Sequence, residues 1–84
     1  MTTDQGLIHS FLEIKIAETG ASKNTIAAYE RDLREFATWL QGNRNKLLKV
    51  TQKHIESYLV DQEQKGFAPA TRARRLSVIK QFFL

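Results

Sequence analysis

Three glycines divide this chain into four segments of similar length, and this division constrains the fold more than any other feature. Gly20, Gly42 and Gly66 lie about twenty residues apart, and each follows a stretch with helical periodicity. Glycine at such a position can adopt the left-handed conformation that ends a helix. The chain has 84 residues, enough for one domain with a single core. The spacing therefore predicts one all-α domain of four helices.

Apolar residues repeat at helical spacing within each segment. The first helix is predicted from about Asp4, as its N-cap, to Thr19, and the second from the N-cap Ser22 to Gly42. The third is predicted from the N-cap Thr51 to Gly66, and the fourth from Pro69 onward. The predicted core residues are Leu7, Ile8, Phe11 and Leu12; Ile26, Tyr29, Leu33, Phe36 and Leu40; Ile55, Tyr58 and Leu59; and Ala73, Leu76, Ile79 and Phe83, with Val78 and Phe82 flanking. Residues 12–16 alternate as a strand would, but no second strand is available to pair with them, so we expect a helix there. Residues 43–50 form the longest connection.

Composition excludes several classes of protein and site. The chain has no cysteine, which excludes disulfide scaffolds and thiolate metal sites and fits a reducing compartment. His9 and His54 lie far apart in the sequence with no other ligands around them, so we expect no metal and no cofactor. No apolar run approaches the roughly 18 residues of a membrane span, and no signal-peptide layout is present. We therefore expect a small cytoplasmic domain.

Basic side chains are unevenly distributed along the chain. There are 13 Lys and Arg against 9 Asp and Glu, for a formal charge of +4. Residues 1–35 carry a slight excess of acids, whereas residues 36–55 and 65–84 contain bases and no acid. Two acid-free basic stretches in one small domain are typical of a surface that binds phosphate. The alternative interpretation is ordinary solvated surface charge, which is the common role of single Lys and Arg residues.

Two local patterns are candidates for a phosphate-binding surface. In the first, Arg72, Arg74 and Arg75 stand close together with no nearby acid to relieve their repulsion. A helical wheel directs Arg74 to solvent and places Arg72 and Arg75 nearer the apolar side, where they would cross a neighbouring helix or reach a ligand. Guanidinium groups suit phosphate and guanine edges. The second pattern is the start of the second helix, where free N–H groups attract anions, and its candidate residues are Lys23, Asn24 and Thr25.

Other polar side chains are assigned structural roles. Tyr29 and Tyr58 lie on apolar stripes, so we expect them to be buried with hydrogen-bonded hydroxyls. Asp32 lies between Arg31 and Arg34 and is interpreted as a local ion-pair partner or a cap to a neighbouring element. Lys46 and Lys49 lie in the long connection, where a contact with backbone phosphate and an ordinary solvated loop charge are equally good interpretations.

Three patterns occur in order from Ser22 to Phe83. The first is Ser22-x-x-Thr25-x-x-x-Tyr29-x-x-Asp32-Leu33-x-x-Phe36-x-x-Trp39-Leu40. The second is Leu48-x-Val50-Thr51-x-x-x-Ile55-x-x-Tyr58-Leu59, and the third is Gly66-x-x-x-x-Thr71-x-x-Arg74-x-Leu76-Ser77-x-Ile79-Lys80-x-Phe82-Phe83. Together they resemble the N-terminal core-binding domain of the tyrosine recombinases, the phage integrase and Xer-type family, and the resemblance covers about residues 7–84.

This resemblance implies a four-helix, SAM-like orthogonal bundle that forms one half of a C-shaped clamp around DNA. In that family the second and fourth helices approach the major groove and its flanking phosphates. The residues that the resemblance and the charge pattern assign to DNA binding are Lys23, Asn24, Thr25, Thr71, Arg72, Arg74, Arg75 and Lys80. Ala68 and Pro69 depart from the family pattern, because they stand where a Ser cap often begins the fourth helix.

The resemblance also implies that residues 1–84 are not themselves an enzyme. The catalytic residues of the family, an Arg–Lys–His/Arg set and a nucleophilic tyrosine, belong to a separate C-terminal domain. The fourth helix reaches Leu84 without a stop signal, from which we expect truncation from a longer recombinase. The expected partners are double-stranded DNA, the C-terminal catalytic domain of the parent chain, and other recombinase protomers in a DNA-bound tetramer. No membrane partner is expected.

Two other classes of function remain as alternatives. A helical protein-interaction module is the main one, since SAM-like bundles commonly self-associate. A free-standing transcription factor would need a helix–turn–helix, for which residues 66–69 offer the only link. The basic stretches favour DNA over a protein partner, and the fourth helix, which lacks a stop signal, favours a multidomain parent over a free-standing factor.

Overall fold

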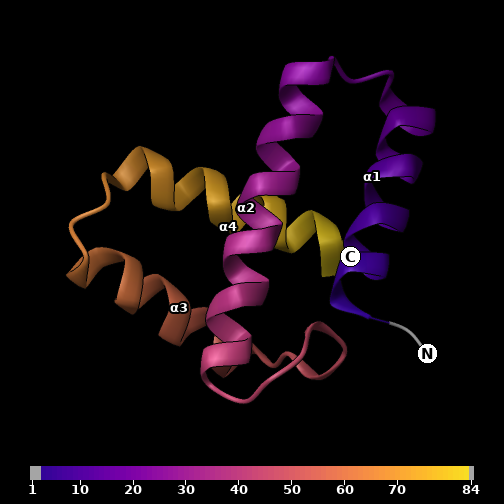
Figure 1. The fold of residues 1–84 in the computed structure, drawn as a ribbon. Coiled ribbons are helices and arrows are strands. Elements are labelled where there is room, and N and C mark those ends of the chain that lie inside the picture. Colours follow the sequence, from indigo (N-terminus) through magenta and orange to yellow (C-terminus); the bar gives the residue numbers. More distant parts are fainter. Residues whose placement is uncertain (1–2, 84) are drawn as a thin grey trace.

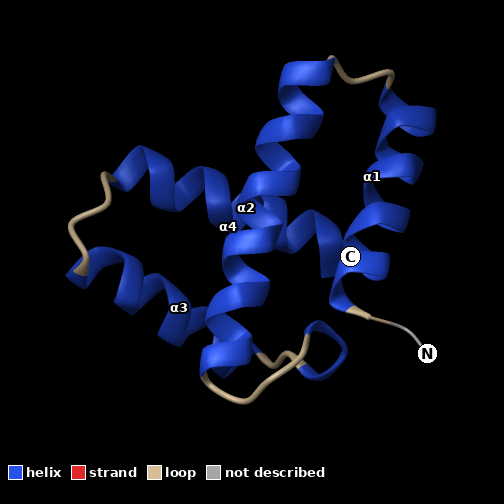
Figure 2. Cartoon of the chain, in the orientation of Figure 1, coloured by secondary structure: helices blue, strands red, loops and turns tan. Residues whose placement is uncertain are grey.

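Four α-helices follow one another in the computed structural model, which describes residues 3–83 (Figures 1 and 2). The elements are α1 (Asp4–Thr19), α2 (Lys23–Gly42), a 3-10 turn (Leu47–Lys49), α3 (Gln52–Gln64) and α4 (Pro69–Phe83). The described residues contain no strand, and residues 12–16 lie within α1. The prediction of an all-α, four-helix SAM-like bundle is confirmed. Leu84, on which the sequence-based expectation of a longer chain rests, lies outside the described residues.

The central helix of the arrangement is α2. Figure 1 shows α1 running antiparallel beside it on one side and α4 crossing behind it, with α3 and α4 forming a hairpin on the other side. The end of α4 reaches α1, where the ring centroids of Phe11 and Phe82 lie 5.3 Å apart. Helices α1, α3 and α4 thus all pack on α2. No helix in residues 3–83 is long and apolar enough to cross a membrane.

The core is built around the apolar stripe of α2. Leu33, Phe36 and Leu40 are fully buried, as their spacing predicts. The Phe36 ring lies 4.8 Å from the Tyr58 ring of α3 and 6.2 Å from Trp39, measured between centroids. The other buried apolar residues are Ile8, Leu12, Ala37, Leu47, Val78 and Ile79.

The caps of two helices differ from the sequence-based predictions. Thr3, not Asp4, caps α1, because its hydroxyl accepts a hydrogen bond from the Gly6 amide at 3.0 Å. The Asp4 carboxylate instead accepts from the Leu47 amide at 3.2 Å and so ties the start of α1 to the long connection. Gly20 and Gly66 adopt left-handed conformations, as predicted. Gly42 lies inside α2.

The end of α2 is made by an asparagine rather than by that glycine. Asn43 donates both its side-chain amide, at 2.9 Å, and its backbone N–H, at 3.2 Å, to the Trp39 carbonyl, so the last turn is closed without a left-handed glycine. The left-handed residue of this connection is Arg44, at φ 61°. The connection is therefore shaped by side-chain hydrogen bonds that glycine spacing alone does not reveal.

The core-facing side of α4 is rotated relative to the prediction. Val78 and Ile79 are buried and Leu76 is half-buried, but Ala73 and Phe83 are exposed. The reason is that a charged residue, Arg75, takes a core-facing position one turn before Val78 and Ile79. A prediction based only on apolar residues does not include Arg75 in the core face, so the predicted core face is rotated about the helix axis relative to the observed one.

Candidate nucleic-acid interface

The start of α2 presents polar side chains to solvent. Ser22 caps the helix by accepting a hydrogen bond from the Thr25 amide at 3.2 Å, and the hydroxyls of Ser22 and Thr25 lie 3.1 Å apart. Thr25 therefore takes part in the cap, which the sequence did not predict. Lys23 and Asn24 are exposed and make no side-chain hydrogen bond or ion pair within residues 3–83. An exposed cation and amide beside free helix N–H groups favour an anionic ligand.

The three arginines of α4 are all paired with acids, contrary to the expectation from the sequence. Arg72 lies 3.6 Å from Glu63 of α3 and donates to the Phe67 carbonyl. Arg74 and Arg75 reach acids of α2. The expected unrelieved repulsion is absent because the neutralising carboxylates come from other helices: Glu63 of α3, nine residues before Arg72, and Asp32 and Glu35 of α2, about 40 residues before Arg74 and Arg75.

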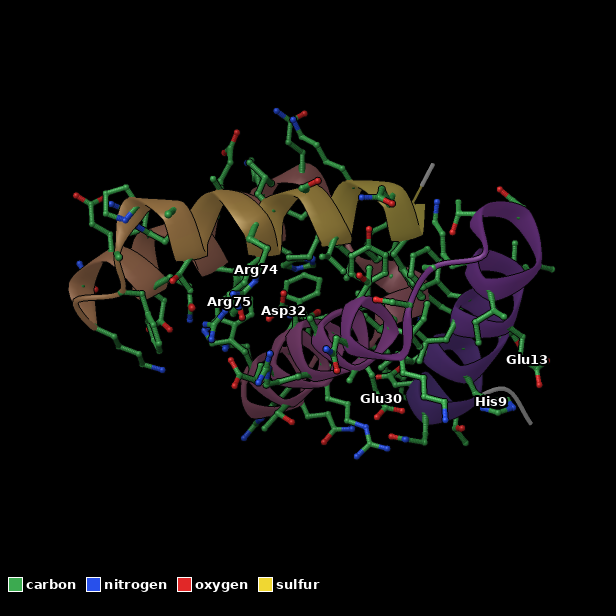
Figure 3. The ribbon with its side chains drawn as sticks, turned by 90° about the horizontal axis from the view of Figure 1, so that it is seen from above. His9, Glu13, Glu30, Asp32, Arg74 and Arg75 are labelled. Carbon is green, nitrogen blue, oxygen red and sulfur yellow. The ribbon has the colours of Figure 1, made fainter. Side chains whose placement is uncertain are left out.

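Arg74 forms a two-pronged ion pair with Asp32 across the crossing of α4 and α2 (Figure 3). Its Nε and Nη2 donate to Oδ2 and Oδ1 of Asp32, both at 3.0 Å. Asp32 is 1% exposed, whereas the Arg74 side chain is 47% exposed. These hydrogen bonds raise the pKa of Arg74 above its normal value. The interpretation of Asp32 as a local ion-pair partner is wrong, because its partners come from α4.

Arg75 is an internal cross-link rather than a surface residue. Its side chain is 7% exposed and lies 2.6 Å from Glu35 and 3.7 Å from Asp32, both on α2. It also donates to the Gln62 side chain of α3, and its guanidinium lies 4.4 Å from the centroid of the Phe67 ring. One side chain thus joins α2, α3 and the link before α4. This agrees with the wheel-based alternative that Arg75 crosses a neighbouring helix.

The remaining candidate residues of α4 differ in exposure. Thr71 is half-buried near the start of the helix, and Lys80 is exposed in its last turn. The candidate interface is defined here as the exposed start of α2 together with the outward side of α4, and its exposed members are Lys23, Asn24, Thr25, Arg74 and Lys80.

Sequence reasoning missed Asp32 and Glu35 as partners of the arginines. These two acids lie one turn apart from each other on α2, beside the buried positions Leu33 and Phe36. A charge at the edge of a strongly apolar stripe is the signal that could have identified them, because folding brings such a side chain against the core: Asp32 is fully buried and needs a partner, and Glu35 is half-exposed.

Tyr58 lies beside this network, and its hydroxyl differs from expectation. The residue is buried, as predicted, but its hydroxyl makes no well-formed hydrogen bond among the described residues and has only a weak polar contact with Arg75. Burial raises the pKa of Tyr58 to about 12, although the charge of nearby Arg75 acts in the opposite direction. The folded protein therefore favours the neutral phenol more strongly than the unfolded chain does.

We expect Tyr58→Phe to reduce the loss of stability at high pH. The phenol's contribution is fully present below its unfolded pKa of about 10 and is lost as the pH rises toward the folded value of about 12. At pH 7 the variant should lie within about 1 kcal/mol of the original chain, because the hydroxyl makes no well-formed hydrogen bond. Urea unfolding at pH 7, 10 and 11 measures both effects. Equal losses between pH 10 and 11 in the two proteins would contradict this account.

One protein-family model matches nearly the whole chain. The family is described as "Phage integrase, N-terminal SAM-like domain", and its model matches residues 8–84. The three sequence patterns, which run from Ser22 to Phe83, fall within this range.

Curated relatives are similar over the same region. The chain is 42% identical over 76 residues to the tyrosine recombinase XerD of Brucella abortus biovar 1, and this match covers 90% of this chain and 25% of the relative. It is 34% identical over 83 residues to the tyrosine recombinase XerD of Caulobacter vibrioides, and this match covers 99% of this chain and 27% of the relative. The chain thus spans about a quarter of the length of these relatives. No solved structure matches it.

Proposed function

Because the chain belongs to the family of phage integrase N-terminal SAM-like domains, we propose that it is the DNA-binding module of a site-specific tyrosine recombinase. It docks α2 and α4 on a recombination half-site as one half of a clamp. The family match carries this proposal, and the exposure of Lys23, Arg74 and Lys80 supports it.

The proposed division of labour follows from the relatives' names and lengths. The relatives are tyrosine recombinases about four times as long as this chain. The parent protein is accordingly a DNA strand-transferring recombinase whose catalytic Arg, Lys, His or Arg, and Tyr residues lie in a C-terminal domain. Residues 1–84 hold the duplex against that domain and contact neighbouring protomers in the DNA-bound tetramer. They perform no chemistry themselves.

The side chains of the interface divide into two physical roles. Lys23 adds a point charge at the N-terminus of α2, where the helix dipole and free N–H groups already favour phosphate. Lys80 adds a second exposed point charge, this one on α4. Arg74 presents a planar set of donors that suits phosphate or a guanine edge. The major groove of B-DNA, about 12 Å wide, admits a helix, so α4 or the start of α2 can enter it.

We expect the chain to bind a short mixed-sequence duplex weakly, with an affinity that falls steeply with salt. If about four phosphates are neutralised, the slope of log K against log salt is near −3.6. Lys23→Ala should reduce the magnitude of this slope by about 1, because it removes one phosphate contact. Fluorescence anisotropy from low to physiological salt measures the slope.

The matched control is Lys53→Ala. Lys53 is also exposed, but it lines a surface depression with Trp39 and Asn43 at the opposite end of α2. Lys23 is the first residue of α2 and Asn43 follows its last, and a 20-residue helix is about 30 Å long. We expect Lys53→Ala to leave the slope unchanged. Equal slopes for Lys23→Ala and the original chain would contradict the assignment of α2, and no salt-dependent binding at all would contradict the proposed function.

A helical protein-interaction module is the second candidate. It is favoured by two apolar residues of α1, Ile14 and Ile16, which are 54% and 50% exposed. Ile16 also lines an apolar depression with Ala21, Ile26 and Ala27 at the junction of α1 and α2. This function predicts self-association that Ile14→Ser weakens, together with DNA binding that is absent or independent of salt. Sedimentation velocity over a range of protein concentrations distinguishes it from the first candidate.

A further inference from the structure

The Asp32–Arg74 pair combines a buried acid with a half-exposed base. A guanidinium has five N–H donors, and Asp32 accepts two of them. The other three stay available on a side chain that is 47% exposed. Figure 3 shows Arg74 and Asp32 facing each other between α4 and α2, in a view from the end at which α2 begins. The carboxylate thus holds one edge of the guanidinium and leaves the other edge open.

Asp32 cannot itself meet a ligand, because it is 1% exposed. Its charge is covered by Arg74 and, at 3.7 Å, by the buried Arg75. Arg75 is in turn held by Glu35 at 2.6 Å. The acid is therefore fixed from the inside of the bundle, and it presents a rigid two-oxygen edge to Arg74 at the surface.

We propose that Asp32 is a positioning residue for DNA binding, which fixes the guanidinium of Arg74 so that its remaining donors face the duplex. This inference rests on the proposed function. A free arginine side chain has many rotamers, and part of this conformational entropy is lost when it binds a ligand. The two-point contact with Asp32 removes this freedom before DNA arrives, so less affinity is lost on binding.

The proposal predicts a change whose sign is opposite to that of simple electrostatics. Asp32→Asn raises the formal charge by one from +4, which by itself strengthens binding to a polyanion. It also places an amide NH₂ against a donor of Arg74, so the two-pronged contact is lost. If Asp32 positions Arg74, affinity for DNA falls, by about fivefold to tenfold.

The matched control is Glu30→Gln, which makes the same charge change two residues earlier on α2. Glu30 pairs only with Arg34, at 3.6 Å, in the described residues, and both side chains are well exposed. We expect this variant to bind the duplex as tightly as the original chain or more tightly. Circular dichroism of each variant at the binding temperature gives the folded fraction, by which the apparent affinity is corrected.

Arg74→Lys supplies a second test that keeps the charge and removes the fork. Lysine cannot form the two-point contact with Asp32, so we expect its affinity to fall at least as far as that of Asp32→Asn. Because Arg74 is half-exposed, this variant is informative even if Asp32→Asn fails to fold. The double variant with Asp32→Asn should lose no further affinity, because the two residues act together.

The outcomes separate the two proposals. If the original chain binds DNA with the expected salt dependence but Asp32→Asn binds as tightly as Glu30→Gln, the positioning role is wrong and the proposed function stands. The same holds if Arg74→Lys binds like the original chain. If the original chain shows no salt-dependent binding, both proposals are wrong. Weaker binding by Asp32→Asn and Arg74→Lys, with Glu30→Gln unaffected, supports both.

Discussion

Arg75→Ala is expected to lower the free energy of unfolding by about 3 kcal/mol, the lower end of the cost of breaking a buried ion pair, because Arg75 and Asp32 are buried whereas Glu35 is 46% exposed. The change deprives the Gln62 side chain and the Glu35 carboxylate of their contact with α4. It also removes one of the two cations around the buried Asp32. A domain of this size has a total stability of only about 5–10 kcal/mol, so the variant should be close to unfolding at 37 °C.

The measurement is urea unfolding followed by circular dichroism, with Arg34→Ala as the control. Arg34 also pairs with a glutamate, Glu30, but that pair is exposed and its N–O distance is 3.6 Å. Exposed pairs contribute about 0–1 kcal/mol, so the control should unfold almost like the original chain. A loss below about 1 kcal/mol for Arg75→Ala would show that Arg75 is not the cross-link described here.

Phe36→Ala is expected to have a similarly large effect, about 3–5 kcal/mol, because it removes a fully buried ring. Phe36, Trp39 and Tyr58 form a cluster of three mutually contacting rings where α2 meets α3. The cavity left by alanine borders both of the other aromatic residues, so the surroundings cannot close around it without moving α3.

Phe83→Ala is the matched control for this substitution. Phe83 lies on the apolar stripe predicted from the sequence, but it is 39% exposed in the structure. Its replacement should cost well under half as much as that of Phe36, since little apolar area is lost from the interior. Thermal unfolding of both variants decides between the two assignments of the core face of α4. Equal losses would favour the sequence-based stripe.

The sequence was sufficient to predict the number of helices, most of their boundaries and the core of α2. These features depend on local spacing, and each helix start was marked by a cap or a proline. The family prediction is confirmed as well, because the patterns from Ser22 to Phe83 fall within the match to the family model. Helix ends made by side chains, such as that at Asn43, were not predicted, since a glycine nearby gave a competing signal.

The surroundings of the arginines could not be predicted in the same way. Arg74 and Asp32 are 42 residues apart, and only the crossing of α2 and α4 brings them together. Counting acids within the same stretch therefore gave the wrong electrostatic environment for Arg72, Arg74 and Arg75. The assignment of the DNA-contacting residues stays a prediction, and the structure narrows it by showing which of these side chains are exposed.

The most direct test of the DNA-binding role is a heteronuclear NMR titration of the chain with a short duplex at low salt. The account predicts amide shifts concentrated at residues 22–25 and 71–81, and their reversal on addition of salt. Shifts that are absent, or that depend only on protein concentration, would contradict it and favour a protein-interaction bundle.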